Sequence, residues 1–323
     1  MQEYDIVYED EARTDAILWQ SYLTCIVHEE WQTDVTYHAR AANAPNMRAV
    51  MARSREDGSH LSSVVWFEYE RDGTALIATY LTEERARGNG LGTKMWNAAM
   101  ERIPKHLSFG LVAAQSMEPK YRATWAPHHE RSQVDYQYSG ENLRMACQTI
   151  IKTAVPFGKL VHRNRSEFTE ADIEKILKFD AKATGRDRSP FLREYFSYPE
   201  VVDTVAMFVG DRLIGYGDAM AIPSKSGVKL FRIAPLFAEQ EEIAVRIMLR
   251  VVENVMRREP SAVFYFCTVT DTVGEQLAER LSEAVTPDGK FGPFAELYSR
   301  PYTNPLDNTR FFLPHSHIFH FDA

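Results

Sequence analysis

The feature that most constrains the fold of this chain is a glycine-rich turn between two stretches of different period. Residues 74–81 form an apolar run typical of a strand. From residue 91 the apolar positions 91, 95, 99, 100 and 103 share one face of a predicted helix. The turn between them holds Gly88, Gly90 and Gly92. Such a turn lets successive backbone N–H groups converge on an anion at the start of the helix.

The elements around this turn form a definite order. Residues 47–54, 61–70 and 74–81 are predicted strands, separated by short turns that end in Gly58 and Gly73, so they form an antiparallel meander. A buried strand is predicted after the helix, at 107–114, and helical spacing precedes the meander at 12–31 and 38–48. The predicted class is therefore α+β.

Two common phosphate-binding loops do not fit this turn. A Walker A loop requires a lysine after its last glycine, and none follows Gly92. A dinucleotide-binding fingerprint requires a third glycine, but position 93 is Thr, and the turn follows an antiparallel meander rather than the first strand of a parallel sheet.

The turn does resemble another loop. Arg85-Ala-Arg-Gly88-Asn-Gly90 is similar to the Arg-x-x-Gly-x-Gly loop of the GNAT (GCN5-related N-acetyltransferase) superfamily, and the surrounding elements follow that family's order. The resemblance implies acetyl-CoA as cosubstrate, without a metal. The residues expected to bind it are Tyr80, Leu81, Thr82, Arg87, Gly88, Asn89, Gly90, Leu91, Gly92 and Thr93.

The second half of the chain repeats the element order and resembles a diverged, YitH-like GNAT domain through residues 179–192 and 235–244. The second of these segments stands where the phosphate loop is expected, yet it has three glutamates and no glycine. We therefore expect it not to hold a pyrophosphate in the usual way. The predicted organisation is two tandem GNAT-like domains, each a mixed, mainly antiparallel twisted sheet flanked by helices. An N-terminal domain at 1–140 is followed by a connector at 141–155 and a C-terminal domain at 156–323.

The resemblance also implies a mechanism, in which a neutral amine attacks the thioester directly. A main-chain N–H near Tyr80 to Thr82 would stabilise the oxyanion, and Tyr121 is the candidate general acid, because it follows the fifth strand as the family's tyrosine does. The family's following Gly-Phe is replaced by Arg-Ala, so Tyr121 is equally open to interpretation as a half-buried core tyrosine.

The general base is less constrained. The predicted strand at 74–81 contains no Asp, Glu or His, so the candidates are Glu68, on the neighbouring strand, and Glu29, with His28 beside it in the acceptor site. A solvated helix end explains His28 and Glu29 as well. Asp180 and Arg188 are candidates for the acceptor pocket, or for an ion pair that braces a turn between helices.

Composition limits the partners and the compartment. There are 37 basic and 45 acidic residues, a net charge of -8, which argues against nucleic acid. No stretch resembles a membrane span or a leader, and the three cysteines lack any metal or disulfide spacing, so we expect a cytoplasmic protein with no membrane partner. In a strand, His315 and His317 would share one face, with His320 nearby, but no acid lies at useful spacing before Asp322, and we expect no metal.

The predicted function is acetyl-CoA-dependent N-acetylation of a small primary amine or amino-acid-like acceptor. Two alternatives stay open: acetylation of a protein lysine, and a non-catalytic CoA-binding or interaction protein. A homodimer is also open, because apolar helix faces can pack within a chain or between chains.

Overall fold

The computed structural model describes residues 3–28, 39, 42, 44–152, 160–224 and 227–315, and its contacts divide the chain into two compact units. Unit 1 comprises Met1–Glu130 and Ala295–Tyr302. Unit 2 comprises Arg131–Phe294 and Thr303–Ala323. The contacts thus divide the chain before residue 140, where the sequence places a boundary, and assign a C-terminal segment to unit 1.

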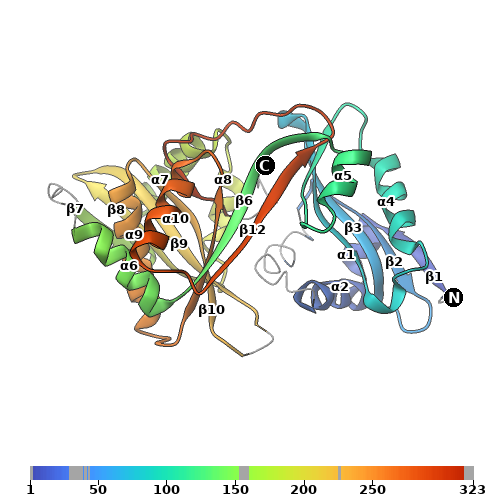
Figure 1. Ribbon diagram of the computed structural model, residues 1–323, viewed down its shortest axis with the longest axis horizontal. Coiled ribbons are helices and arrows are strands. Elements are labelled where there is room, and N and C mark those ends of the chain that lie inside the picture. The colour runs from blue at the N-terminus through green and yellow to red at the C-terminus, as the bar shows by residue number, and fades with distance from the viewer. Residues whose placement is uncertain are drawn as a thin grey trace. The chain divides into compact units, whose positions relative to one another are not determined.

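Unit 1 contains a mixed sheet in which β4 and β5 are parallel and the other neighbours antiparallel (Figure 1). The strand order is β1-β2-β3-β4-β5-β12. At its edge, residues 296–298 of β12 pair with β5. The strands are β1 (Tyr4–Tyr8), β2 (Met47–Ser54), β3 (His60–Tyr69), β4 (Thr74–Thr82), β5 (Ser108–Val112) and β12 (Gly289–Tyr298).

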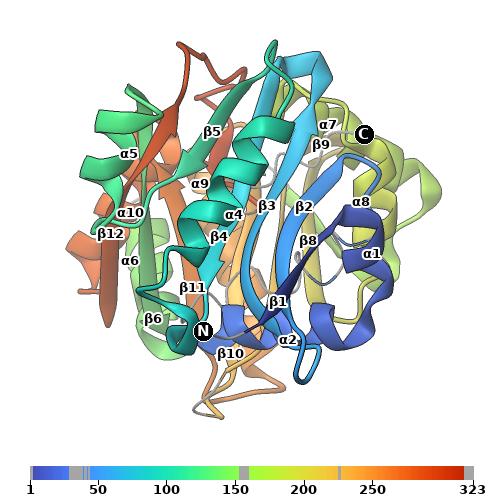
Figure 2. The same cartoon turned by 90° about the vertical axis from the view of Figure 1, so that its right-hand side faces the viewer.

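The helices of unit 1 cover this sheet, and α4 packs against β3 and β4, as Figure 2 shows. Trp66 on β3 and Trp96 on α4 are fully buried in the core between them. The helices are α1 (Glu9–Thr14), α2 (Ala16–His28), α4 (Leu91–Arg102) and α5 (Glu118–Thr124), with short 3-10 turns η2 (Glu70–Asp72) and η3 (Glu84–Ala86).

The helical stretch predicted at 12–31 is two helices in the structure, α1 and α2, and residues 29–31 lie outside the described ones. Asp15 adopts an extended backbone that ends α1, and its carboxylate accepts the Leu18 N–H at 3.0 Å, which caps the start of α2. Local capping therefore overrides the apolar period. The predicted helix at 38–48 is wrong over its second half, because residues 44–46 form a turn and 47 and 48 belong to β2; residues 38, 40, 41 and 43 lie outside the described ones.

Unit 2 has the strand order β6-β11-β10-β9-β8-β7, in which β10 and β11 are parallel, and β13 pairs with β10. Its strands are β6 (His128–Ser139), β7 (Leu160–Asn164), β8 (Val201–Val209), β9 (Arg212–Ile222), β10 (Leu230–Ala238), β11 (Val263–Val269) and β13 (Phe311–Leu313). Its helices are α6 (Gly140–Lys152), α7 (Glu170–Thr184), α8 (Ser189–Tyr195), α9 (Glu241–Met256) and α10 (Val273–Ala284), with the 3-10 turn η4 (Arg165–Glu167).

Both units contain the same strand–turn–helix–strand arrangement. In unit 1 it is β4, α4 and the parallel β5, and in unit 2 it is β10, α9 and the parallel β11. The predicted class, α+β with mixed, mainly antiparallel sheets flanked by helices, is confirmed. Among the described residues, no helix has the length and apolar content that crossing a membrane requires.

Candidate functional site

The glycine-rich turn of unit 1 presents an open helix start. Gly88 and Gly90 have left-handed backbones, with φ of 82° and 74°, and Gly90 is the N-cap of α4. Residues 87–90 are exposed, and α4 has neither an acidic residue in its first turn nor a side-chain cap among the described residues. Its first N–H groups therefore face solvent with a positive potential, which suits an anion.

Gly92 brings α4 close to β4. A Cβ atom built at Gly92 would lie 2.7 Å from the Thr82 hydroxyl oxygen and 2.9 Å from the Tyr80 hydroxyl oxygen. A larger residue would push these side chains away. Arg87 donates from Nε to the Thr82 carbonyl at 2.8 Å, so its guanidinium is held beside the turn. The turn, the end of β4 and the start of α4 thus form one compact surface.

The parallel pairing of β4 with β5 stops where the ladder of β4 with β3 becomes irregular, and we call the unpaired stretch beside β4 the gap. β4 pairs with β5 only from Thr74 to Ile77. On the other side, Val65 pairs with Thr79 but Trp66 with Ile77, so Ala78 is an extra residue in β4. Among the described residues no strand pairs with residues 78–82 on the β5 side. The edge of β4 is therefore unpaired from the bulge to the glycine turn.

The backbone of Tyr80 faces this gap. The N–H of Glu83 donates to the Leu61 carbonyl at 2.9 Å, which marks that pair as a hydrogen-bonded one in the ladder. Because such pairs alternate, the backbone groups of Leu81 and Thr79 face β3, whereas those of Tyr80 and Thr82 face the open edge. A main-chain N–H at Tyr80 is thus available to an oxygen atom in the gap.

Tyr121 lies in an aromatic cluster next to this edge. Its ring centroid is 5.5 Å from that of Trp96, which in turn is 5.1 Å from that of Tyr80. Tyr121 is 6% exposed. Burial, with a smaller contribution from Tyr80, raises the pKa of Tyr121 above its usual range, so the phenol keeps its proton at neutral pH.

In the part of the chain that the structure describes, the predicted bases do not come together beside residues 78–82 of β4. Glu68 pairs with Ala75, where β4 is still paired with β5. Its carboxylate accepts the Trp66 indole N–H at 3.1 Å and lies 3.2 Å from Arg48 Nε. His28 is the exposed last residue of α2, and Glu29 lies outside the described residues. The base role of Glu68 and Glu29 stays a prediction.

Asp180 and Arg188 form a buried ion pair within unit 2. Arg188 donates to Asp180 through Nε at 2.9 Å and through a second guanidinium nitrogen, and Tyr216 donates its hydroxyl to the same carboxylate. Asp180 and Arg188 are 0% and 4% exposed. The geometry fits a brace between α7 and α8, and loss of one partner would leave a buried charge, at a cost of about 3–5 kcal/mol. A role in acceptor binding stays a prediction.

Sequence reasoning missed a buried polar cluster on the other face of β4. The Tyr22 and Thr79 hydroxyl oxygens are 2.8 Å apart, and His60 Nε2 is 2.9 Å from the Ser63 hydroxyl oxygen. All four side chains are buried. A signal was present, because Thr79 is a polar residue inside the apolar run of β4.

The corresponding gap in unit 2 is filled by the chain itself. β10 pairs with β11 only over Leu230–Arg232, and its register with β9 then shifts between Ile233 and Leu236. Beyond this irregularity, Leu236 and Phe237 pair with β13, which also contacts β11 and α10. Unit 2 therefore shares the diverging parallel pair of unit 1, with a third strand in the space between.

The turn after β10 also differs from its counterpart in unit 1. Its helix N-cap is Gln240, with an extended backbone, and Glu241 and Glu242 occupy the first turn of α9. Glu239 pairs with Arg212, and Glu241 pairs with Arg280. Carboxylates complement the positive end of this helix and would repel a phosphate, as expected from the sequence.

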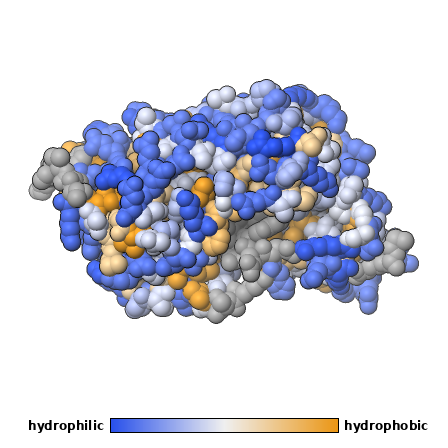
Figure 3. All heavy atoms as spheres, in the orientation of Figure 1, coloured by the Kyte–Doolittle hydropathy of each residue, from blue (hydrophilic) through white to orange (hydrophobic). Residues whose placement is uncertain are grey.

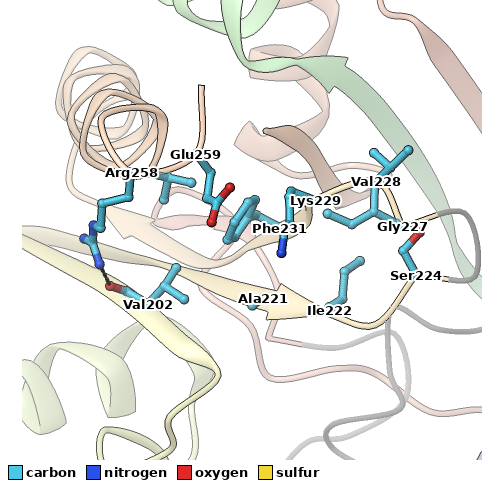
Figure 4. Close-up of a pocket in the computed structure, with 12 residues that line it drawn as sticks. Val202, Ala221, Ile222, Ser224, Gly227, Val228, Lys229, Phe231, Arg258 and Glu259 are labelled. Carbon is cyan, nitrogen blue, oxygen red and sulfur yellow. Dashed lines mark hydrogen bonds between the residues drawn. The ribbon is translucent and has the colours of Figure 1, made fainter. Parts of the chain in front are cut away.

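A pocket of about 410 Å³ lies elsewhere in unit 2, at the ends of β9 and β10 (Figure 4). It is lined by apolar residues such as Ile222 and Phe231, with Lys229, Arg258 and Glu259 beside them, and by none of the predicted site residues. Figure 3 shows a mainly hydrophilic surface on the face it displays. The described residues include no cluster of three metal-binding side chains, whereas His317 and His320 lie outside them.

Comparison with known proteins agrees with this geometry. Residues 176–259 match the sequence model of the acetyltransferase (GNAT) domain, and the uncharacterized Caenorhabditis elegans protein F36G3.2 is 26% identical over 99% of this chain and 98% of its own. A tandem GNAT protein from the clavulanic acid biosynthesis pathway superposes with a TM-score of 0.66 at 14% identity, over 93% of this chain and all of the other. A GCN5-related N-acetyltransferase from Sphaerobacter thermophilus gives a TM-score of 0.53 at 12% identity, over 93% and 97% of the two chains.

At these identities the superpositions show the fold. The sequence match covers part of unit 2, whereas the glycine-rich turn is in unit 1. Residues 176–259 thus match a GNAT acetyltransferase domain in sequence, and the chain shares the fold of a tandem GNAT protein.

Proposed function

We propose that this protein is an acetyl-CoA-dependent N-acetyltransferase that acts on a small primary amine or amino-acid-like acceptor. One observation carries the proposal: unit 1 has an unpaired β4 edge that ends in an exposed glycine turn at a helix start. The pyrophosphate would bind the N–H groups of residues 88–93 and Arg87, and the pantetheine arm would lie along the open edge of β4.

The proposed reaction is direct transfer. The amine nitrogen forms a bond to the thioester carbonyl carbon, the carbon–sulfur bond breaks, and the thiolate takes a proton to become free CoA. Tyr80 N–H would stabilise the oxyanion, and Tyr121 would protonate the thiolate. The proton lost by the amine passes to a base, for which Glu68 and Glu29 remain the predicted carboxylates.

We propose further that each chain binds one acetyl-CoA. In unit 2, β13 fills the space beside β10, and Glu241 and Glu242 stand at the start of the helix. Both features oppose a second cosubstrate molecule, so unit 2 would shape the protein rather than bind the donor.

Calorimetric titration of acetyl-CoA tests this proposal. Wild type should bind one molecule per chain. Gly90→Asp, which places a carboxylate in the turn, should bind at least about 100-fold more weakly, because like charges would be juxtaposed. Gly73→Asp is the matched control: Gly73 also has a left-handed backbone, with φ of 66°, and lies in the turn before β4. It should bind as wild type.

Thiol release in the presence of an amine panel then tests transfer. The three cysteines of the chain are buried, so their background reaction with a thiol reagent should be low. Release with small amines and loss of turnover in Tyr121→Phe would support the proposal. Release only with a lysine-containing peptide would favour protein acetylation, and binding without release would favour a non-catalytic protein. Two molecules per chain would contradict the role given to β13, and no binding at all would overturn the whole proposal.

A further inference from the structure

A buried hydrogen bond links helix α2 to the irregular part of β4. The hydroxyl oxygens of Tyr22 and Thr79 are 2.8 Å apart, and the two side chains are 0% and 3% exposed. The Tyr22 ring also packs against Trp19 and His60, with centroid distances of 5.2 and 5.5 Å. The contacts with Trp19 and His60 therefore restrain the Tyr22 ring, and its hydroxyl is directed at β4.

Thr79 occupies a sensitive position in the strand. It directly follows Ala78, the extra residue of the bulge, and directly precedes Tyr80, whose N–H faces the gap. A bulge interrupts the ladder and bends the strand locally. On the β5 side, the described residues provide no strand to restrain residues 78–82. The bond from Tyr22 is thus a restraint on this segment in addition to the ladder with β3.

Stability alone gives little reason for this pair. A buried hydroxyl pair contributes about 1 kcal/mol net, and replacement of both partners by apolar groups of the same shape can be nearly neutral. A Phe and a Val would fill the same space. A hydroxyl pair, unlike an apolar contact, fixes the direction of the strand at one residue.

We propose that Tyr22 is a positioning residue, which holds Thr79 so that the Tyr80 N–H is aimed at the thioester carbonyl. The inference rests on the proposed function, because it needs acetyl-CoA in the gap beside β4. Tyr22 itself touches neither the cosubstrate nor the acceptor in this account. It acts through the backbone of one strand.

The test observes the thioester carbonyl of bound acetyl-CoA directly, so it does not require a known acceptor amine. Acetyl-CoA labelled with carbon-13 at the acetyl carbonyl is bound to the full chain, and its C=O stretching frequency is recorded by infrared difference spectroscopy. In wild type a hydrogen bond from Tyr80 should lower this frequency. Tyr22→Phe and Thr79→Val should each lose most of this shift, while the Kd for acetyl-CoA changes less than about 2-fold, because the glycine turn is untouched.

A matched control comes from unit 2. Tyr138 is also fully buried, and its hydroxyl oxygen lies 3.3 Å from that of Ser282. Tyr138→Phe removes a comparable hydroxyl and should leave the carbonyl shift at its wild-type value. With an amine acceptor from the panel, Tyr22→Phe should lower kcat about 10-fold at unchanged KM for acetyl-CoA, less than the loss of an oxyanion donor itself. The double variant Tyr22→Phe/Thr79→Val should lose no more than either single one.

The outcomes separate the two proposals. Failure of wild type to bind acetyl-CoA would overturn the proposed function and this inference with it. Binding without a frequency shift would leave the cosubstrate site in place but overturn the role of the Tyr80 N–H. A full shift in Tyr22→Phe would overturn the positioning role alone. If Tyr22→Phe does not fold, Thr79→Val gives the same reading from the other partner.

Discussion

At the scale of single residues, the site combines an exposed turn with buried polar pairs beneath it. The turn could be predicted from sequence, because left-handed backbone favours glycine, and the glycines at positions 88 and 90 are visible in the sequence. The Tyr22–Thr79 pair could not, because its partners are 57 residues apart and periodicity assigns a face but not a partner. Tyr121 was predicted from its place after the fifth strand; in the structure its ring contacts that of Trp96, which also contacts the ring of Tyr80, and its role as the acid stays a prediction.

The buried His60, which pairs with Ser63, makes the stability of unit 1 depend on pH. It is 0% exposed, and burial, with a contribution from Arg85, lowers its pKa from the ordinary 6.5 to about 3. The folded state therefore keeps the imidazole neutral, whereas the unfolded chain binds a proton below pH 6.5. The stability that depends on neutral His60 is fully present above pH 6.5 and is lost as pH falls from 6.5 toward 3.

We predict that His60→Gln weakens this pH dependence. Gln can still hydrogen-bond to Ser63 but does not titrate. Between pH 5.5 and 4, the free energy of unfolding should fall less steeply with pH in His60→Gln than in wild type. The two slopes should differ by about 1.4 kcal/mol per pH unit, as expected for one proton. Chemical denaturation at a series of pH values measures it. Parallel slopes for His60→Gln and wild type would refute the prediction.

At the scale of elements, local sequence patterns were sufficient to predict a strand or helix that packs against the next element along the chain. The predicted strand at 47–54 and the helix start at residue 91 agree with β2 and α4. Strands β12 and β13 were not predicted. Strand β13 is only three residues long, and what makes it a strand is its pairing with β10, which no local pattern encodes.

We predict that Gly274→Ala strongly destabilises unit 2. A Cβ atom at Gly274, in the first turn of α10, would lie 1.8 Å from the Phe312 carbonyl oxygen in β13. That oxygen is backbone and cannot rotate away, so overpacking should cost about 3 kcal/mol. The gain in helix propensity, about 1 kcal/mol, is smaller. Urea denaturation followed by far-UV circular dichroism measures the net loss.

The control for this variant is Gln276→Ala, an exposed position in the same helix. It changes helix propensity without contact to β13 and should leave the midpoint nearly unchanged or slightly raised. If Gly274→Ala were as stable as wild type, β13 would not be packed against α10 as the structure has it. The assignment of β13 to the space beside β10 would then fail.

At the scale of the whole molecule, chain order and unit membership do not coincide. Sequence reasoning divides the chain into consecutive halves because it follows element order. The contacts instead assign Ala295–Tyr302 to unit 1, where residues 296–298 complete the sheet beside β5. Such an exchange leaves no local signal, because a strand's apolar pattern does not identify the sheet that it joins.

This assignment can be tested because the five tryptophans all lie between residues 19 and 125, within the first segment of unit 1. Tryptophan fluorescence therefore follows the unfolding of unit 1, whereas far-UV circular dichroism follows both units. We predict that Leu297→Ala, at a fully buried position in the core of unit 1, lowers the unfolding free energy seen by fluorescence by about 2–5 kcal/mol, although residue 297 is far away in sequence.

Leu281→Ala is the matched control, because Leu281 is equally buried but belongs to the core of unit 2. It should shift the transition seen by circular dichroism and shift the fluorescence transition less than Leu297→Ala does. The opposite ranking of the two variants by fluorescence would place residue 297 in unit 2 and contradict the division. If the ranking is as predicted, the C-terminal segment stabilises the unit that carries the glycine turn. Because acetyl-CoA would bind folded unit 1 and not the unfolded chain, it should stabilise unit 1 in both variants. The fluorescence midpoint should then rise in Leu281→Ala and in Leu297→Ala.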